Sequence, residues 1–241
     1  MRRVLVTRPE PGAAHTAGRL RQLGFEPLVL PLSETKPSVV DMATVPEGAA
    51  AVAVTSASAV RHAPSGLIER LALLPCHAVG ERTAAAARIA GFRTVEAGPG
   101  DATALADGIA PVLAGTALVY LCGHERFPAF EERLTAAGVQ VWSVETYDTV
   151  ALDPPDEAVH ALLGGARADA LLLYSAKAAQ AAGRLYRRAD LAPWLADAAV
   201  LSLSRRIAAV FAAACPGHRG TMQVAPRPDE DALLALLRPG S

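Results

Sequence analysis

Short apolar runs alternate with amphipathic stretches along almost the whole chain. Residues 4–6 and 51–54 are continuously apolar, which is typical of strands buried on both faces of a parallel sheet. Between such runs, apolar residues recur at helical spacing, as at Phe127, Phe130 and Leu134. This alternation predicts an α/β protein with parallel sheets. The strands expected on this basis are 4–7, 25–30, 51–55, 76–79, 93–97, 117–121, 139–144, 170–174 and 200–203.

Two stretches are predicted to stay extended at places where the alternation of strands and helices predicts a helix. Residues 139–144 alternate in polarity and continue without a break through 145–152, which is rich in Val, Thr and Tyr. Residues 28–37 continue in the same way after the second expected strand. We interpret the two stretches as connections that cross between two lobes and form a two-stranded β-ladder hinge. Tyr147 would then lie beside the cleft.

The second half of the chain repeats the pattern of the first. Four pairs of segments match in the same order, and the offset between them rises slowly, as loop insertions would cause. Chance similarity between generic strand–helix units is the alternative, but the shared order favours a duplication. The pairs are 19–25 with 133–139, 51–59 with 170–178, 77–84 with 200–208, and 103–105 with 231–233.

The length of 241 residues exceeds that of a usual single domain, so two lobes are expected. If the chain crosses twice, lobe one consists of residues 1–33 plus 152–241 and lobe two of residues 38–146. Residues 34–37 and 147–151 are then the linkers, and each lobe holds a parallel five-stranded sheet. A tandem division near residue 115 is the competing arrangement.

The composition narrows the class of protein. Hydrophobic residues make up 51% of the chain, yet no run is long enough to span a membrane, and the start does not resemble a signal peptide. Three widely spaced cysteines suit a reducing cytoplasm. The net charge of −1 gives no reason to expect binding to nucleic acid.

Candidate chemistry lies in the turns that follow the expected strands. In an open parallel sheet, ligands bind beyond the carboxyl ends of the strands, where helix N-termini and their N–H groups gather. Small residues and nearby basic residues in these turns predict a cleft that binds anions. Taken alone, Ser56 and Ser175 are better explained as plain helix N-caps, so the prediction rests on the turns as a set. The turns are 8–9, 56–58, 80–83, 98–99, 122–126, 175–177 and 204–206.

Several familiar chemistries are missing from the sequence. It contains no Walker loop, no Gly-x-Gly-x-x-Gly after the first strand and no Gly-x-Ser-x-Gly elbow. Cys122 and His124 form a single Cys-x-His pair with no second pair to complete a metal site. The residues alone therefore predict a hinged binder of a polyanionic small molecule, with or without catalysis.

Several of these turns carry a resemblance to a known family. Val-Thr-Arg-Pro at 6–9, Thr-Ser at 55–56, Val-Gly-Glu-Arg-Thr-Ala at 79–84, Tyr-Asp-Thr at 147–149 and Ser175 resemble the uroporphyrinogen-III synthases. The resemblance covers essentially the whole chain. It implies two flavodoxin-like lobes that cyclise hydroxymethylbilane to uroporphyrinogen III, with loss of water and inversion of ring D. It also implies that the enzyme needs no cofactor and no metal.

The resemblance assigns roles to individual residues. Tyr147 is the expected catalytic proton donor, although a tyrosine that packs between the lobes would look the same. Arg8 and Lys177 are expected to bind substrate carboxylates. The family usually has Gly and Thr where this chain has Ser204 and Ile207, and often Arg at Cys122, so contacts there are in doubt. The expected substrate-binding residues are Arg8, Thr55, Ser56, Gly80, Thr83, Gly123, Ser175, Lys177 and Ser204.

The resemblance also implies where the protein acts and which partner supplies its substrate. The family implies a cytoplasmic monomer that makes transient contact with hydroxymethylbilane synthase and supplies haem, sirohaem and cobalamin. A non-catalytic, hinged binding or sensor protein for a small polyanion is the alternative from a different class. A nucleotide-dependent enzyme is a third hypothesis, weakened by the missing phosphate loops.

Overall fold

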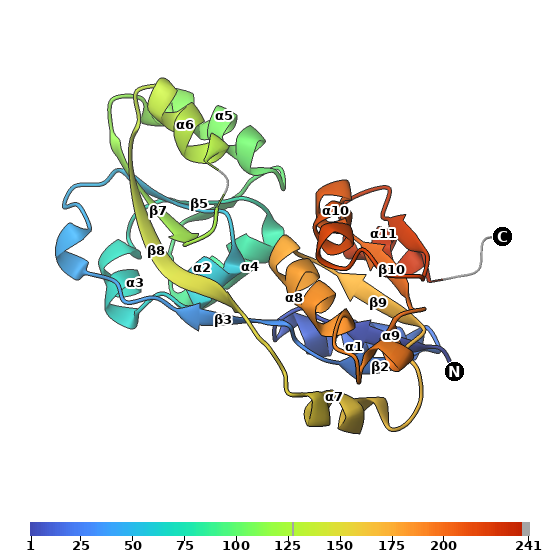
Figure 1. Ribbon diagram of the computed structural model, residues 1–241. Coiled ribbons are helices and arrows are strands. Elements are labelled where there is room, and N and C mark those ends of the chain that lie inside the picture. The colour runs from blue at the N-terminus through green and yellow to red at the C-terminus, as the bar shows by residue number, and fades with distance from the viewer. Residues whose placement is uncertain (127, 238–241) are drawn as a thin grey trace. The chain divides into compact units, whose positions relative to one another are not determined.

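The computed structural model describes residues 1–126 and 128–237 (Figure 1). Phe127, expected on a helix face, and residues 238–241, expected in lobe one, lie outside the described residues. The chain divides into two compact units, one formed by Met1–Glu34 with Val150–Ser241 and the other by Thr35–Thr149. The first unit is therefore built from both ends of the chain, and the second is one continuous segment.

Unit 1 contains a parallel sheet with helices on both faces. In the described residues its strands have the order β11-β10-β9-β1-β2, and every neighbouring pair is parallel. The strands are β1 (Arg3–Val6), β2 (Glu26–Val29), β9 (Ala170–Leu173), β10 (Ala199–Ser202) and β11 (Met222–Val224). The helices are α1 (Gly12–Gln22), α7 (Asp156–Leu163), α8 (Ala176–Tyr186), α9 (Ala192–Leu195), α10 (Arg205–Ala214) and α11 (Glu230–Ala235).

The central strands are continuously apolar because both of their faces are buried, as the sequence predicted. Side chains alternate across a strand, so Leu5 of β1 faces one core, which includes Phe211 of α10. Val4 and Val6 face the other core, which includes Leu20 of α1. Both faces of the sheet are covered by helices, and polar residues in the strand would have no access to water.

Unit 2 is built on the same plan. Its sheet has the order β3-β8-β7-β4-β5-β6, and the strands from β8 to β6 are parallel. The strands are β3 (Ser33–Pro37), β4 (Ala51–Val54), β5 (Cys76–Ala78), β6 (Val95–Ala97), β7 (Ala117–Gly123) and β8 (Gln140–Ala151). The helices are η1 (Met42–Thr44), α2 (Ala57–Arg61), α3 (Ser65–Leu71), α4 (Glu81–Ala90), α5 (Ala102–Leu113) and α6 (Ala129–Ala136).

The two extended crossovers pair with each other. The Ser38 N–H donates to the Thr146 carbonyl at 2.9 Å, and the Leu152 N–H donates to the Leu32 carbonyl at 3.0 Å. From Leu32 to Ser38 the residue number rises while that of the partner falls from 152 to 146, so β3 and β8 are antiparallel. The α/β fold class is confirmed, and so is the parallel five-stranded sheet of unit 1; in the described residues the sheet of unit 2 has six strands, of which only the five from β8 to β6 are parallel. The ladder is not a separate element, however, because β8 is one continuous strand that adds β3 to the edge of the second sheet.

The sheet orders agree with the repeat seen in the sequence. The repeat pairs β1 with β7, β2 with β8, β4 with β9, β5 with β10 and β6 with β11. Replacing every strand by its counterpart turns the order β11-β10-β9-β1-β2 into β6-β5-β4-β7-β8, which is the parallel part of the second sheet. Each unit thus takes two strands from one copy and three from the other. Within each unit the order is that of flavodoxin-like sheets.

No helix within the two described ranges is both long enough and apolar enough to cross a bilayer.

Candidate functional site

The three serines expected in the turns after the strands lie at the N-termini of helices. Each hydroxyl accepts a backbone N–H from the first turn of its helix, which satisfies a donor that the helix itself leaves unpaired. Each serine still has a proton to donate to a ligand. The bonds join Ser56 to Ser58 at 3.2 Å, Ser175 to Ala178 at 3.1 Å, and Ser204 to Ile207 at 3.4 Å.

A cavity of about 500 Å³ lies within unit 2 at the carboxyl ends of β4 and β7. It brings together four of the expected site residues: Thr55, Ser56, Gly123 and Tyr147. Gly80 and Thr83 do not line it. The other lining residues are Asp101, Ala102, Thr103, Tyr120, Glu125, Arg126, Ala129 and Phe130.

Tyr147 owes its position to a glycine on the neighbouring strand. Gly123 lies opposite Tyr147 in the pairing of β7 with β8, at a register shift in the ladder. A Cβ atom at position 123 would come within 2.6 Å of the Tyr147 ring, which is shorter than any normal contact. The backbone of this pair is also fixed, because the His124 N–H donates to the Tyr147 carbonyl at 2.9 Å. Only glycine at 123 therefore lets the ring lie at the cavity wall.

A second tyrosine, which the sequence did not single out, also borders this cavity. The Tyr120 hydroxyl lies 2.7 Å from the Thr55 hydroxyl, and the Tyr120 ring packs against Phe130 with centroids 4.6 Å apart. Burial raises the pKa of Tyr120 to about 12, although the hydrogen bond with Thr55 acts against this shift. The phenol is therefore protonated at neutral pH and can share a proton with Thr55.

Positive charge reaches the cavity through Arg126. Its guanidinium binds the carboxylates of Glu131 and of Glu145, the latter at 2.7 Å. Glu145 also contacts the His124 ring at 2.9 Å, and this hydrogen bond, together with those from Arg126, lowers the pKa of the Glu145 carboxyl. Cys122 is 1% exposed inside the sheet, and burial raises its thiol pKa to about 12. The positive charge at this cavity therefore comes from Arg126, whereas the buried Cys122 thiol is neutral.

Gly80 and Thr83 lie at the carboxyl end of the next strand, β5. Gly80 is the N-cap of α4, and a Cβ there would lie 3.3 Å from the Gly100 Cα. Thr83 is in the first turn of α4 and is 6% exposed. Both residues therefore shape the start of a helix, next to the cavity-lining turn after β4 but outside the cavity itself.

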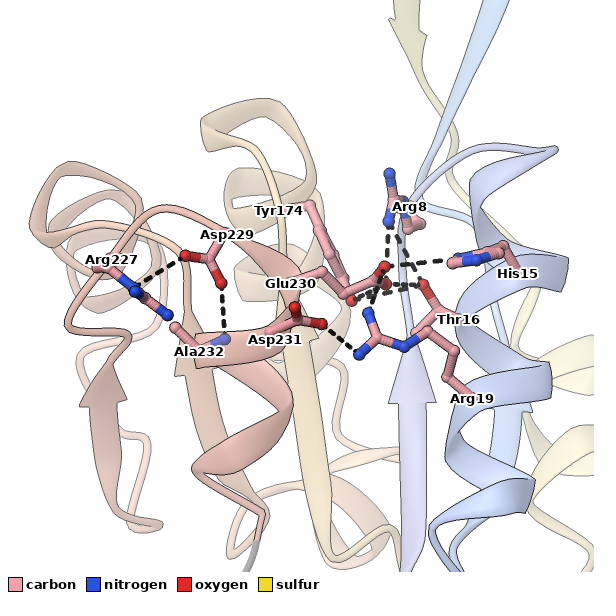
Figure 2. Close-up of polar contacts among 10 residues, drawn as sticks. All are labelled: Arg8, His15, Thr16, Arg19, Tyr174, Arg227, Asp229, Glu230, Asp231 and Ala232. Carbon is pink, nitrogen blue, oxygen red and sulfur yellow. Dashed lines mark hydrogen bonds and ion pairs between the residues drawn. The ribbon is translucent and has the colours of Figure 1, made fainter. Parts of the chain in front are cut away.

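In unit 1, Arg8 is part of a network of polar side chains (Figure 2). Its guanidinium donates to Glu230 at 3.1 Å and stacks over the Tyr174 ring at 4.4 Å. The Glu230 carboxylate also accepts from Thr16, from Tyr174 at 3.0 Å and from Arg19 at 3.1 Å. A substrate carboxylate at Arg8 would share that guanidinium with Glu230.

The charge of Glu230 is held in place by these donors. Burial by itself raises the pKa of the carboxyl, but the hydrogen bonds from Thr16 and Tyr174 and the charge of Arg8 outweigh burial, so the net pKa is lowered. Nothing in the sequence pattern predicted a role for Glu230. An acidic residue in the first turn of α11 is explained locally by the helix dipole, and its partners are far away in the chain.

The remaining expected residues of unit 1 lie along the same edge of the sheet as Arg8. Ser175 and Lys177 follow β9, and Ser204 follows β10, so the turns after three adjacent strands carry them. In residues 1–126 and 128–237, no group of three or more His, Cys, Asp or Glu side chains is arranged to hold a metal ion.

A family model described as uroporphyrinogen-III synthase HemD matches residues 14–235. The chain belongs to the uroporphyrinogen-III synthase family. It is an enzyme with the cyclising, lyase-type activity of that family, acts in tetrapyrrole biosynthesis, and takes the small molecule hydroxymethylbilane as substrate. Nothing in the comparison supports the non-catalytic alternative.

Solved structures of uroporphyrinogen-III synthases share the fold. The enzyme from Helicobacter pylori matches with a TM-score of 0.62 at 17% identity, over 98% of each chain. A mutant enzyme from the extremely thermophilic bacterium Thermus thermophilus matches with a TM-score of 0.50 at 18% identity, over 99% of this chain and 98% of that one. No curated protein sequence matches significantly. The two-unit α/β architecture is therefore that of the uroporphyrinogen-III synthases.

Proposed function

We propose that the cavity beside Tyr147 receives the reacting end of hydroxymethylbilane during its cyclisation to uroporphyrinogen III. The observation that carries this proposal is the meeting of Tyr147, Thr55, Ser56 and Gly123 at one cavity. These residues come from three adjacent strands, β4, β7 and β8, or directly follow them, and each was expected at the site from its sequence context. The pocket is lined by several hydroxyls and by the Arg126 guanidinium, beside the carboxylates of Asp101 and Glu125; its hydroxyls suit a leaving hydroxyl, and its guanidinium suits a substrate carboxylate.

In the proposed reaction, the hydroxyl of ring A leaves as water and an electrophilic azafulvene forms. Tyr147 donates the proton that turns the departing hydroxide into water. The substituted carbon of ring D then attacks, and the spiro intermediate fragments and recloses with ring D inverted. Ring D loses a proton as the macrocycle closes, which allows the tyrosinate to be reprotonated. Proton donation of this kind contributes roughly 10²–10⁴-fold in rate.

The other expected residues hold the substrate. Arg8 and Lys177 in unit 1 follow β1 and β9, and Arg126 in unit 2 follows β7, so each offers a positive charge beyond the carboxyl end of a strand. The backbone N–H groups of the helices that begin after Ser56 and Ser175 favour anions in the same way. Holding the linear tetrapyrrole folded is itself a large contribution, because a fixed geometry lowers the entropic part of the barrier.

The test of the function is to supply freshly generated hydroxymethylbilane and separate the product isomers. Spontaneous closure gives the type I ring, so an excess of the type III ring over a protein-free control supports the proposal. A type I to type III ratio equal to that of the control would refute it.

The test of Tyr147 is the variant Tyr147→Phe, which keeps the ring and removes the proton. We expect type III formation to slow by roughly 10²–10⁴-fold with little change in substrate affinity. Trp142→Phe on the same strand is the matched control, because Trp142 is 39% exposed and does not line the cavity. Full turnover by Tyr147→Phe would remove Tyr147 from the mechanism.

The proposal extends to the location of the protein in the cell, its oligomeric state and the source of its substrate. We propose a cytoplasmic monomer whose two units move about the β3–β8 connection, and which receives its substrate from hydroxymethylbilane synthase by transient contact. An unstable substrate that closes spontaneously to the wrong isomer favours such a short transfer. Sedimentation of the chain alone tests the monomer, and a stable dimer would contradict it. Sedimentation together with that synthase tests the transient contact.

A further inference from the structure

A second cavity, of about 730 Å³, lies within unit 1. Its walls come from the segments that precede β9, β10 and β11, so it lies at the amino ends of these strands. The residues expected to bind substrate in this unit follow the same strands at their carboxyl ends. β9 has four residues, and at about 3.3 Å per residue the two edges are roughly 13 Å apart. This amino-end pocket is therefore distinct from the site described above.

Buried polar atoms without partners lie at this pocket. Tyr186 is 3% exposed, and its hydroxyl has no hydrogen-bond partner among the described residues. Both ring nitrogens of His218 are likewise buried and unpartnered among those residues. The two rings pack together with centroids 5.7 Å apart, and both line the cavity. Leaving such groups unpaired is unfavourable, so a tyrosine hydroxyl and an imidazole side by side point to a ligand that pairs with them.

The mouth of the amino-end pocket carries an excess of positive charge. Arg167, Arg187 and Arg219 line it. Asp197 binds Arg167 at 3.3 Å and Arg219 at 3.0 Å, so two guanidiniums share one carboxylate. Within the described part of the chain, Arg187 has no ion pair. The local charge thus favours an anion, while the rest of the wall is formed by small apolar residues and prolines, including Ala192, Pro193 and Pro216.

We propose that the amino-end pocket binds a small organic carboxylate with an apolar body, as a ligand site separate from the substrate. The carboxylate accepts hydrogen bonds from the Tyr186 hydroxyl and from one ring N–H of His218, and Arg187 neutralises its charge. The apolar body packs against Pro193 and Pro216. Because a carboxylate has several acceptor sites and no donor, it matches a phenol, an imidazole N–H and a guanidinium together. The inference stands independently of the proposed function.

The experiment uses the full chain and three probes at constant ionic strength: benzoate, succinate and inorganic phosphate. Binding to the folded chain raises the melting temperature in a saturable way, and calorimetric titration gives the affinity directly. We expect benzoate to bind best, since it has one carboxylate and an apolar body. Absence of saturable binding by either carboxylate, or binding of phosphate alone, would overturn the proposal.

Two variants locate the binding. Tyr186→Phe removes only the unpartnered hydroxyl, so the free protein should keep its fold and its melting temperature. Arg187→Gln removes the charge at the mouth. Each is expected to weaken benzoate binding by about tenfold or more. Arg184→Gln, one turn earlier on α8 and outside the cavity lining, is the control and should bind as the unmodified chain does. Equal affinity in all three variants would place the ligand elsewhere and refute the site.

Discussion

Replacing Glu230 with glutamine perturbs the centre of the polar network of unit 1. The carboxylate joins Thr16 and Arg19 of α1 to Arg8 after β1 and to Tyr174 after β9 (Figure 2). Glutamine has the same shape and keeps one oxygen that can accept from the two hydroxyls. It loses the negative charge that both guanidiniums share, and it places an amide N–H₂ group near one of them.

The size of the effect follows from these contacts. A hydrogen bond to a charged group contributes about 1.5–3 kcal/mol to stability, and two of the four donors are charged. The Glu230 side chain is 18% exposed, so water recovers only part of the loss. We expect the free energy of unfolding to fall by about 2–3 kcal/mol at neutral pH, which is a large share of the stability of a typical domain, about 5–15 kcal/mol.

The pH dependence has a definite sign. The pKa of the Glu230 carboxyl is lower in the folded chain than in the unfolded chain. The network therefore stabilises the fold at pH values above the unfolded pKa, about 4.3, and this contribution is lost as the pH falls through the folded pKa. Glu230→Gln has no such contribution to lose. The gap in stability between the two proteins should thus narrow in acid.

The assay is urea unfolding followed by circular dichroism at neutral pH and at several acid pH values. Glu157→Gln is the matched control, because Glu157 is also an acidic residue in the first turn of a helix of unit 1 but is exposed. It should change the unfolding free energy by less than about 0.5 kcal/mol. If Glu230→Gln cost no more than Glu157→Gln, or if the gap did not depend on pH, the network would not stabilise the unit as argued.

Three further predictions concern two glycines in close contact with a neighbour and the ionisation of one buried tyrosine. Gly123→Ala would press its methyl group into the Tyr147 ring, so we expect a folded protein with slowed type III formation; unchanged turnover would contradict the placement of that ring. Gly183→Ala would drive its Cβ into the Ala214 Cβ and force α8 away from α10, at a cost of about 1–3 kcal/mol, read as a lower melting temperature in calorimetry. An unshifted melting temperature would show that the helices are less tightly packed than described. The difference between the ultraviolet pH titrations of the unmodified chain and Tyr120→Phe should show a phenol ionising near pH 12, and ionisation near pH 10 would contradict its burial.

The fold was largely predictable because its strands are buried on both faces and its crossovers are not broken. Continuous apolar runs such as Ala51–Val54 mark the centre of a sheet whatever the topology. The unbroken stretch from 139 to 152 correctly predicted an extended connection. The pairing of the two extended stretches was predicted, but not that β3 becomes the edge strand of the second sheet, because Ser33–Pro37 is short, mostly polar and ends in proline. β3 joins the sheet because β8 is one continuous strand from Gln140 to Ala151, long enough to pair with β7 and with β3.

The site was predictable only where the determinants are local. Ser56 and Ser175 were recognisable as residues at helix starts, because a cap depends on the few residues that follow it. Tyr120 was not, because a strand covered on both faces gives no pattern that says which side chain reaches a cavity. Glu230 was missed for a different reason: its partner Thr16 is 214 positions away in the sequence. No local pattern can reveal such a contact.

The division of unit 1 between both chain ends has a consequence for synthesis on the ribosome. β1 pairs with β9, and the buried Thr7 hydroxyl donates to the Leu172 carbonyl at 2.7 Å, so the inner edge of β1 is covered by residues translated much later. At about 5–20 residues per second, β1 and β2 emerge early and wait several seconds for these partners. Unit 2, as one continuous segment, has all its strands by then. The nascent chain therefore carries one unpaired edge of the apolar strand β1 until translation passes β9, and chaperones have their main opportunity to bind during that interval.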